Sequence, residues 1–226
     1  DAYDEIFEEI DTTDLVEKKG IIYVWTNQNL KSRELEIKVR KDLGVKQKLL
    51  TTKEILDLEP NLKPVFAGGA YYDYAYHAKD PQGIVKKIFE LFIKKGGKFV
   101  QENVELVKQT NPNETLIKTE KNEFKFEKSV IACGAFSKKF TDQLGEKIPL
   151  DTERGYHVHF KGMEKLISRP VIFLDRGFGM TPMNQGLRAV GTVELGGLNN
   201  PISKKRIDYI VRCAKELLPQ LKEHQD

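Results

Sequence analysis

The sequence predicts a mixed α+β and α/β fold, in which a small, partial α/β lobe is inserted into a lobe built around an antiparallel sheet. Three observations predict it. The chain has 226 residues and is 39% hydrophobic, enough for one large domain or two small ones. Its middle part runs from a helix through a glycine pair to a strand, which is half of a βαβ unit. Its flanks contain short apolar runs separated by turn residues, as antiparallel strands do.

The first flank, residues 1–78, shows clear signals at the ends of its elements. Gly20 and Gly44 end two predicted helices, because glycine adopts the left-handed conformation that follows a helix. Thr51–Glu54 is a capping box, which predicts the start of a short helix. In chain order we expect a helix before Gly20, a buried strand over 21–25, an amphipathic helix over 29–42, a short helix over 54–58 and a strand over 68–72.

The middle part, residues 79–148, is predicted to be the inserted lobe. Asp80 caps a helix whose first residue is Pro81, and Gly96–Gly97 ends it. We expect strands 98–100 and 130–133 to be parallel neighbours in one sheet, since the second is an apolar run that ends in glycine. The remaining predicted elements are a meander over 104–109, 115–119 and 123–126 and a helix over 137–144.

The last part, residues 149–226, returns to short strands separated by turn residues. The predicted elements are strands over 156–160, 171–174, 179–182 and 187–192 and a helix over 203–218, capped by Ser203. We expect segments 1–78 and 149–200 to share one mostly antiparallel sheet. Two lobes between which the chain passes twice usually enclose a cleft, so a binding site is expected there.

Composition and charge exclude several classes of protein. The 37 basic and 34 acidic residues leave a net charge of only +3, which is no footprint for nucleic acid. No apolar run reaches the length of a membrane-spanning helix, so no membrane span is expected. Cys133 and Cys213 form no disulfide framework, and their apolar surroundings predict buried, reduced thiols. The acidic start is not a secretory signal, and we expect a cytoplasmic protein.

The densest candidate for a functional site is the segment Arg154–His159. On a strand, Arg154 and Tyr156 share one face, whereas His157 and His159 share the other. A guanidinium beside a phenol suits a carboxylate, so we expect Arg154 or Tyr156 to bind one, with His157 in that role if the strand presents its opposite face. The alternative is an ordinary strand. The two histidines could hold a metal only with a third ligand, and no metal is expected.

Three further segments have two interpretations each. The tyrosine-rich run 71–77 is either aromatic packing at a sheet edge or one wall of a ligand cleft. Cys133 is either a small buried residue or part of a small-residue strand end that lets a cofactor approach the backbone. The segment 177–183 joins two strands through glycines and is either a hairpin or the edge of a cleft.

A series of short motifs follows one another along nearly the whole chain. They are Gly68–Tyr71, Asp80–Pro81 with its helix, Gly96–Phe99, Val104, Ala132–Ser137, Glu153–Val158, Arg169–Val171, Thr181–Met183, Gly186–Glu194 and Leu217–Pro219. No one motif is specific. In this order the series resembles the FAD-dependent D-amino-acid dehydrogenase and glycine oxidase family, which is D-amino-acid oxidase-like.

This resemblance implies an enzyme that oxidises the Cα–N bond of a D-amino acid or related amine to an imine, which hydrolyses to a 2-oxo acid. It implies FAD as the redox cofactor. The segment 79–148 would then be a partial FAD-binding lobe, and 1–78 with 149–226 a substrate-binding lobe. By position, Val104 would touch the adenine part of FAD, and Ala132, Cys133 and Gly134 would lie near its ADP portion. The strand 154–158 would line the substrate cavity, with Met180 nearby; no catalytic residue is assigned.

The sequence departs from the family pattern in places. The family's glycine-rich loop, G-x-G-x-x-G, is missing, as is its C-terminal stretch with a carboxylate-binding arginine. Gly179 stands about where glycine oxidases have a tyrosine. We therefore expect the middle portion of a longer enzyme, inactive by itself, unable to hold FAD tightly, and able to form a homodimer through exposed sheet edges. The alternative is a non-catalytic binding or assembly domain of this family that has lost flavin.

Overall fold

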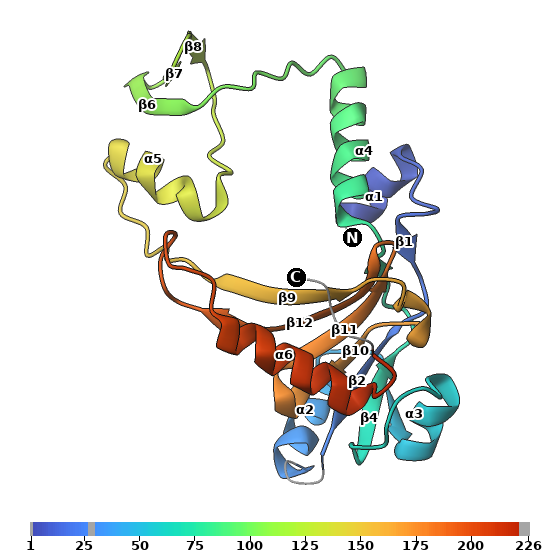
Figure 1. The fold of residues 1–226 in the computed structure, drawn as a ribbon. Helices are drawn as coiled ribbons and strands as arrows, with labels where there is room; N and C mark the ends of the chain where they lie inside the picture. The colour runs from blue at the N-terminus through green and yellow to red at the C-terminus, as the bar shows by residue number, and fades with distance from the viewer. Residues whose placement is uncertain (1, 27–29, 222–226) are drawn as a thin grey trace. The chain divides into compact units, whose positions relative to one another are not determined.

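The computed structural model describes residues 2–26 and 30–221. Within it the chain forms two compact units, drawn in Figure 1. Unit 1 comprises residues 1–94, 155–193 and 202–226, and unit 2 comprises residues 95–154 and 194–201. The chain therefore leaves unit 1 and returns to it, as an insertion requires. That segments 1–78 and 149–226 form a substrate-binding lobe and segment 79–148 a partial FAD-binding lobe stays a prediction.

Unit 1 is built on a seven-stranded sheet that takes strands from both flanks of the chain. In spatial order its strands are β3 (Lys48–Thr51), β4 (Gly68–Tyr72), β2 (Ile21–Trp25), β10 (Val171–Phe173), β11 (Phe178–Met183), β12 (Gly186–Glu194) and β9 (Arg154–Phe160). β10 pairs with β2 in parallel, and the other pairs whose registers are described are antiparallel. This confirms the predicted sheet, which the two flanks share.

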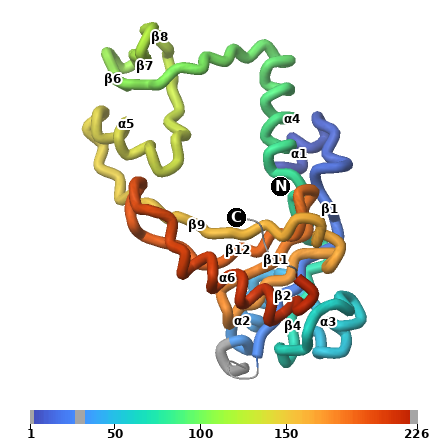
Figure 2. The backbone as a smooth tube through the Cα atoms, in the orientation of Figure 1, coloured from blue at the N-terminus to red at the C-terminus, as the bar shows by residue number. Residues whose placement is uncertain are grey.

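One helix, α6 (Lys204–Leu217), lies along one face of the sheet over the strands β9 to β12 (Figures 1 and 2). Its apolar residues recur at helical spacing and are buried. The main core of unit 1 combines them with alternate residues of the strands. Its members include Ile210, Cys213, Ala214 and Leu217 from α6 and Tyr156, Val158, Phe160, Met180, Leu187 and Ala189 from the sheet. The opposite face of β9 and β12 is not covered by α6.

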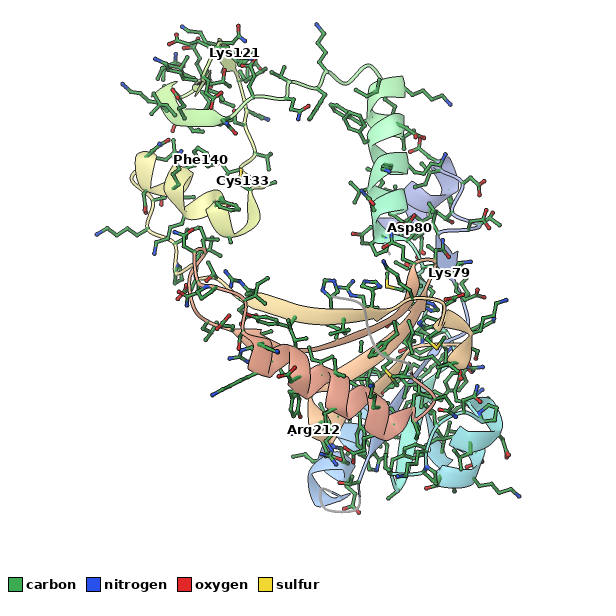
Figure 3. All side chains as sticks on the ribbon, in the orientation of Figure 1. Lys79, Asp80, Lys121, Cys133, Phe140 and Arg212 are labelled. Atoms are coloured by element: carbon green, nitrogen blue, oxygen red, sulfur yellow. The ribbon has the colours of Figure 1, made fainter. Side chains whose placement is uncertain are left out.

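The described part of unit 1 contains further helices. They are α1 (Ala2–Glu9), α2 (Leu30–Asp42), α3 (Thr52–Leu58) and α4 (Pro81–Lys94), and a two-stranded ribbon pairs β1 (Val16–Glu17) with β5 (His77–Ala78). The helix predicted to end at Gly20 is shorter than expected: it ends at Glu9, and Val16–Glu17 pairs as a strand before Gly20. Asp80 accepts a hydrogen bond from the Gly83 backbone N–H at 2.9 Å, as its capping role predicts. Lys79 and Asp80 are labelled at the start of α4 in Figure 3. Among its described residues, two 3₁₀ turns, Glu164–Leu166 and Leu174–Arg176, also lie in this unit.

The capping box of α3 gives a first prediction. The Thr51 hydroxyl accepts from the Glu54 N–H, while the Glu54 carboxylate accepts from the Thr51 N–H at 2.8 Å. Thr51→Ala removes the partner of one free N–H at the helix start and is expected to cost about 1 kcal/mol of unfolding free energy. Thr51→Ser keeps the cap and serves as the control. Urea denaturation measures both, and equal midpoints for the two variants would contradict the account.

Unit 2 contains the predicted meander and a short helix. Its strands β6 (Val104–Asn111), β7 (Glu114–Thr119) and β8 (Glu123–Phe126) form a three-stranded antiparallel sheet. α5 (Ser137–Gln143) follows a 3₁₀ turn over Gly134–Phe136 and buries Phe140, which Figure 3 labels. The Gln143 side chain joins α5 to β6: it accepts from Val107 N at 2.9 Å and donates to Glu105 O at 2.9 Å.

Two predicted strands of the inserted lobe are wrong. Residues 98–100 and 129–133 have no strand structure, and within the described part of the chain nothing pairs with them. Val130 is 91% exposed and Val100 is 49% exposed, although both are strongly apolar. The physical reason is that a strand needs a hydrogen-bonded neighbour, and apolar composition does not supply one. Cys133 is also exposed and not buried, whereas Cys213 is buried as expected.

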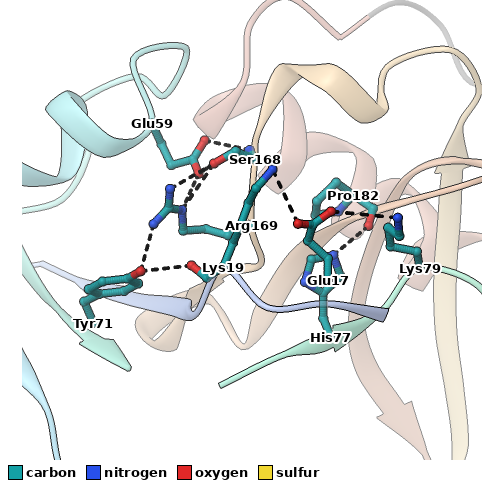
Figure 4. A network of polar contacts seen from close by, with 9 residues as sticks. All are labelled: Glu17, Lys19, Glu59, Tyr71, His77, Lys79, Ser168, Arg169 and Pro182. Atoms are coloured by element: carbon teal, nitrogen blue, oxygen red, sulfur yellow. Dashed lines mark hydrogen bonds and ion pairs between the residues drawn. The ribbon is translucent and has the colours of Figure 1, made fainter. Parts of the chain in front are cut away.

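A buried ion pair joins the two flanks of unit 1 (Figure 4). Glu59, which is 2% exposed, accepts from the Ser168 N–H and hydroxyl and from the Arg169 Nε–H at 2.9 Å. The Arg169 guanidinium donates to the Tyr71 hydroxyl at 3.0 Å, and that hydroxyl donates to the Lys19 carbonyl. Each charged group is therefore fully hydrogen-bonded by residues distant in sequence, which makes this network structural.

Candidate functional site

The face of β9 that carries Tyr156 is turned into the core. Tyr156 is 5% exposed beneath α6, and its hydroxyl accepts a hydrogen bond from the Ser203 N–H at 3.1 Å. Arg154, at the start of β9, lies in unit 2. Its guanidinium donates to the carbonyls of Leu198, Asn200 and Pro201. The structure thus uses both predicted carboxylate-binding residues internally, and it does not bring them together on an open surface.

The opposite face of β9 presents His157 and His159, as the alternation along a strand requires. Their rings are perpendicular to each other, with centroids 5.3 Å apart. On the neighbouring strand β12, Arg188 lies on the same side, because Leu187 and Ala189 beside it point into the core. Three nitrogen-rich side chains therefore gather on the uncovered face of two adjacent strands.

This group, which we call the cationic cluster (His157, His159 and Arg188), has no anionic partner. Among residues 2–26 and 30–221, no side-chain hydrogen bond or ion pair is found for any of the three. The Nε of Arg188 and the Nδ1 of His159 are buried without a hydrogen-bond partner. Buried polar nitrogens are nearly always hydrogen-bonded in proteins, so two orphaned ones in a single cluster indicate a place for a ligand.

The electrostatics of the cationic cluster favour neutral imidazoles when no anion is present. Burial lowers the pKa of His157, and the charges of Arg188 and His159 lower it further. Burial also lowers the pKa of His159, again with help from Arg188. Arg188 must therefore lie close to both rings. A bound anion would reverse this balance, because it would offset the guanidinium charge and favour imidazolium.

Beside the cluster, the uncovered face is apolar. Ile172 on β10 covers Gly179 on β11: a Cβ built on Gly179 would stand 2.4 Å from the Ile172 Cδ1. A larger residue at this position would require the end of the Ile172 side chain to move. Met180, by contrast, is fully buried in the core and does not reach the uncovered face. Its predicted place near the substrate stays a prediction.

Backbone strain marks the same strand. Thr192 on β12 has φ 61°, and it is the sole non-glycine residue of the described ranges with positive φ. Its hydroxyl is buried without a partner. A β-branched residue in this conformation is a genuine outlier, and such outliers concentrate at functional sites. Thr192 lies four residues beyond Arg188, which is consistent with a functional role for this part of β12.

The predicted cofactor-binding residues lie together in unit 2 but are open. Val104 begins β6 and is half-buried. Ala132, Cys133 and Gly134 are exposed, and nothing lies within 4 Å of a Cβ built on Gly134; Figure 3 labels Cys133. Small side chains on an exposed backbone segment allow a dinucleotide to approach that backbone closely. Within the described ranges no glycine-rich loop leads into a helix N-terminus, so a pyrophosphate site is not supplied here.

A cavity of about 560 Å³ in unit 1 is lined by both charged and uncharged residues. His77 lies in its wall, and its Nε2 is 3.1 Å from the Pro182 carbonyl (Figure 4). Because a carbonyl only accepts, Nε2 carries the proton, and burial lowers the pKa of His77. Glu17 pairs with Lys19 and Lys79 across the opening at 3.6 and 3.8 Å. Three of the charged groups of this cavity, Glu17, Lys19 and Lys79, are thus paired with one another.

The tyrosine-rich run 71–77 mainly packs and hydrogen-bonds within unit 1. The Tyr72 hydroxyl accepts from Arg40 at 3.0 Å, and burial raises the pKa of that phenol. Arg40 also lies over the rings of Tyr23 and Tyr72. These side chains border a cavity of about 230 Å³, too small for a drug-sized ligand. Sheet-edge packing is therefore the better interpretation of the run.

Sequence analysis missed Arg188, although a signal was present. Arg188 is a charged residue within the otherwise apolar run Leu187–Val190. Because successive side chains of a strand point to opposite faces, Arg188 is expected on the face opposite the core. No group of three or more histidine, cysteine, aspartate or glutamate side chains that could hold a metal is found in the described residues. Nor do they contain a helix long and apolar enough to cross a membrane.

Comparison with known proteins assigns the chain to one family. The family model described as DAO, FAD dependent oxidoreductase, matches residues 1–226. The chain is 29% identical over 217 residues to a D-amino-acid oxidase of Bradyrhizobium diazoefficiens, covering 96% of this chain and 52% of that protein. It is 27% identical to a D-amino acid dehydrogenase of Vibrio atlanticus, covering 90% and 50%. It thus spans about half the length of these relatives.

The fold has close counterparts among solved structures. The crystal structure of glycine oxidase from Geobacillus kaustophilus superposes with a TM-score of 0.84 and covers 99% of this chain and 61% of that chain. The sequence identity is 19%, so the similarity supports the fold. It extends over both units, including unit 2 with its exposed segments.

Proposed function

The chain belongs to the family of FAD-dependent oxidoreductases, and from this premise we propose that it forms the substrate-binding portion of an enzyme that oxidises the Cα–N bond of a D-amino acid or related amine. The product would be an imine, which hydrolyses to a 2-oxo acid. FAD, when bound, supplies the acceptor for the hydride that leaves Cα. The chain's own contribution is to bind the substrate and hold its Cα in a fixed orientation.

The observation that carries this proposal is the unpaired Arg188 on the uncovered face of the sheet. A guanidinium donates two parallel hydrogen bonds to a carboxylate, which fixes the position and the plane of that group. The orphaned Nε of Arg188 is available for one of them. The apolar surface formed by Ile172 over Gly179 lies beside the cluster and suits the carbon skeleton of a small substrate. Amino acids combine these two features.

The test uses the protein expressed from its complete reading frame and loaded with FAD. D-amino acids and secondary amines are mixed with it under anaerobic conditions, and the loss of oxidised flavin absorbance is followed. This readout does not depend on the electron acceptor, so it covers oxidase and dehydrogenase alike. We expect rapid bleaching by at least one amino acid. If no amino acid or amine reduces the flavin, the enzymatic proposal fails.

One observation favours a second candidate function, a non-catalytic binding domain without flavin. The described residues offer no pyrophosphate site, and Val130 to Gly134 are open. We therefore expect the purified 226-residue chain to be colourless and to leave flavin fluorescence unchanged at micromolar concentration. Stoichiometric yellow flavin in that preparation would contradict this. Failure of the complete reading-frame product to bind FAD would favour the non-catalytic domain.

A further inference from the structure

The cationic cluster holds more hydrogen-bonding capacity than one carboxylate needs. One guanidinium with its five donors can bind a carboxylate by itself. Two imidazoles stand beside it, and among the described residues neither has a hydrogen-bond partner. The Nδ1 of His159 is buried without a hydrogen-bond partner. Leaving a buried polar atom without a partner costs free energy, and a bound ligand that hydrogen-bonds to it would remove this cost. His157 is exposed, so the unpartnered group beside Arg188 is the buried Nδ1 of His159, and a monocarboxylic amino acid bound to Arg188 would leave it unmatched.

We propose that the substrate is an amino acid or amine with a second carboxylate, which His157 and His159 bind while Arg188 binds the first. This inference rests on the proposed function and names the substrate class of the same site. β9 and β12 are neighbouring strands, which lie about 5 Å apart. A chain of two or three carbons between carboxylates spans about 4 to 5 Å, since each C–C bond is about 1.5 Å long. Aspartate and glutamate have these lengths.

The charge balance of the cluster supports the proposal. The charged and titratable groups that bear on the two imidazoles are Arg188 and the imidazoles themselves. With the cluster empty, burial and then the Arg188 charge lower the pKa of both imidazoles. The first carboxylate offsets the guanidinium, and the second then favours protonation of the rings. A dianion should therefore bind with greater uptake of protons than a monoanion.

A matched pair of ligands tests this directly. Succinate and its monoamide, succinamate, have the same length and differ in one charge. Isothermal titration of the 226-residue chain should show succinate binding about tenfold or more tightly at pH 6.5, because a charge-assisted pair is lost with the amide. Succinate affinity should rise as the pH is lowered from 8 to 6, with proton uptake in buffers of different ionisation enthalpy. Succinamate affinity should change less over the same pH range.

Variants distinguish binding at the cationic cluster from a general effect of positive charge on the protein surface. In the double variant His157→Gln and His159→Gln, the preference for succinate should fall to about onefold, and the pH dependence should disappear. Lys161→Gln removes one exposed cation just beyond β9 and should leave the preference intact. Circular dichroism verifies that each variant is folded. A preference that survives the double variant, or an equal affinity of the unaltered chain for both ligands, would overturn the proposal.

Turnover distinguishes this inference from the proposed function. With the FAD-loaded product of the complete reading frame, we expect D-aspartate or D-glutamate to reduce the flavin at least tenfold more efficiently than D-asparagine or D-glutamine. If the amides react as well as the acids, the inference fails and the proposed function stands. If neither acids nor amides react but a neutral amine does, the inference also fails. If nothing reacts, the proposed function itself fails.

Discussion

Arg188→Ala, in the FAD-loaded product of the complete reading frame, is expected to lower kcat/KM for the amino-acid substrate by about 100-fold. The substitution removes a charge-assisted, bidentate contact and leaves a substrate carboxylate unmatched near buried groups. Such a loss costs about 3 kcal/mol, which corresponds to about two powers of ten in rate. Arg188→Lys keeps the charge without the fork geometry and should recover only part of the loss.

Tyr156→Phe is the matched control for this prediction. Tyr156 is buried beneath α6, and its hydroxyl accepts from Ser203 N. Removing the hydroxyl should therefore affect stability by about 1 kcal/mol and leave kcat/KM nearly unchanged. Steady-state kinetics and urea denaturation measure the two effects. If Tyr156→Phe lost as much activity as Arg188→Ala, the substrate would have to contact the other face of β9.

Glu59→Ala is expected to lower the unfolding free energy by about 3–5 kcal/mol. The substitution leaves the half-buried Arg169 guanidinium, Ser168 and the Ser168 N–H without their shared acceptor. Breaking a buried ion pair from one side is costly because an uncompensated charge stays behind. This network also connects α3 to the loop before β10, so the two flanks of unit 1 should separate more easily.

Chemical denaturation of the 226-residue chain measures this loss. Asp73→Ala, which removes the partner of Lys48 in an exposed ion pair, is the control and should leave the midpoint close to that of the unaltered chain. Glu59→Gln keeps the shape and some hydrogen bonds, and its midpoint should lie between the two. A Glu59→Ala midpoint equal to that of Asp73→Ala would show that the network contributes little.

Much of the fold follows from local sequence signals. Asp80, the Thr51–Glu54 capping box and Gly44 act within a few residues of themselves, so the elements that depend on them are found at the expected places, whereas the helix predicted to end at Gly20 ends at Glu9. Six of the seven strands of the large sheet were also predicted, from short apolar runs between turn residues, whereas β3 was not predicted. The prediction of strands over 98–100 and 130–133 was wrong, since strand formation there depends on neighbours that a local pattern cannot specify.

The candidate site was only half predictable. The alternation along β9 correctly places Tyr156 and His157 on opposite faces of the sheet, but it does not predict which of these faces α6 covers. That depends on the apolar face of a helix about 50 residues later in the chain, with Ile210 and Ala214 packed against the Tyr156 side. Arg188 joins the histidines only through the pairing of β12 with β9, a non-local contact. Val104 and Ala132 to Gly134 stay predictions, because no ligand contact tests them.

The central claim, that Arg188 with His157 and His159 forms an anion site, is tested most directly by the imidazole titrations. NMR of the 226-residue chain follows the Cε1–H signals of both histidines with pH, with and without saturating succinate. Both pKa values should lie below the ordinary value of about 6.5 when no anion is present, and both should rise when succinate binds. In Arg188→Gln the empty-state pKa values should already be higher, and succinate should move them little. Ordinary pKa values that neither succinate nor Arg188→Gln changes would contradict the account.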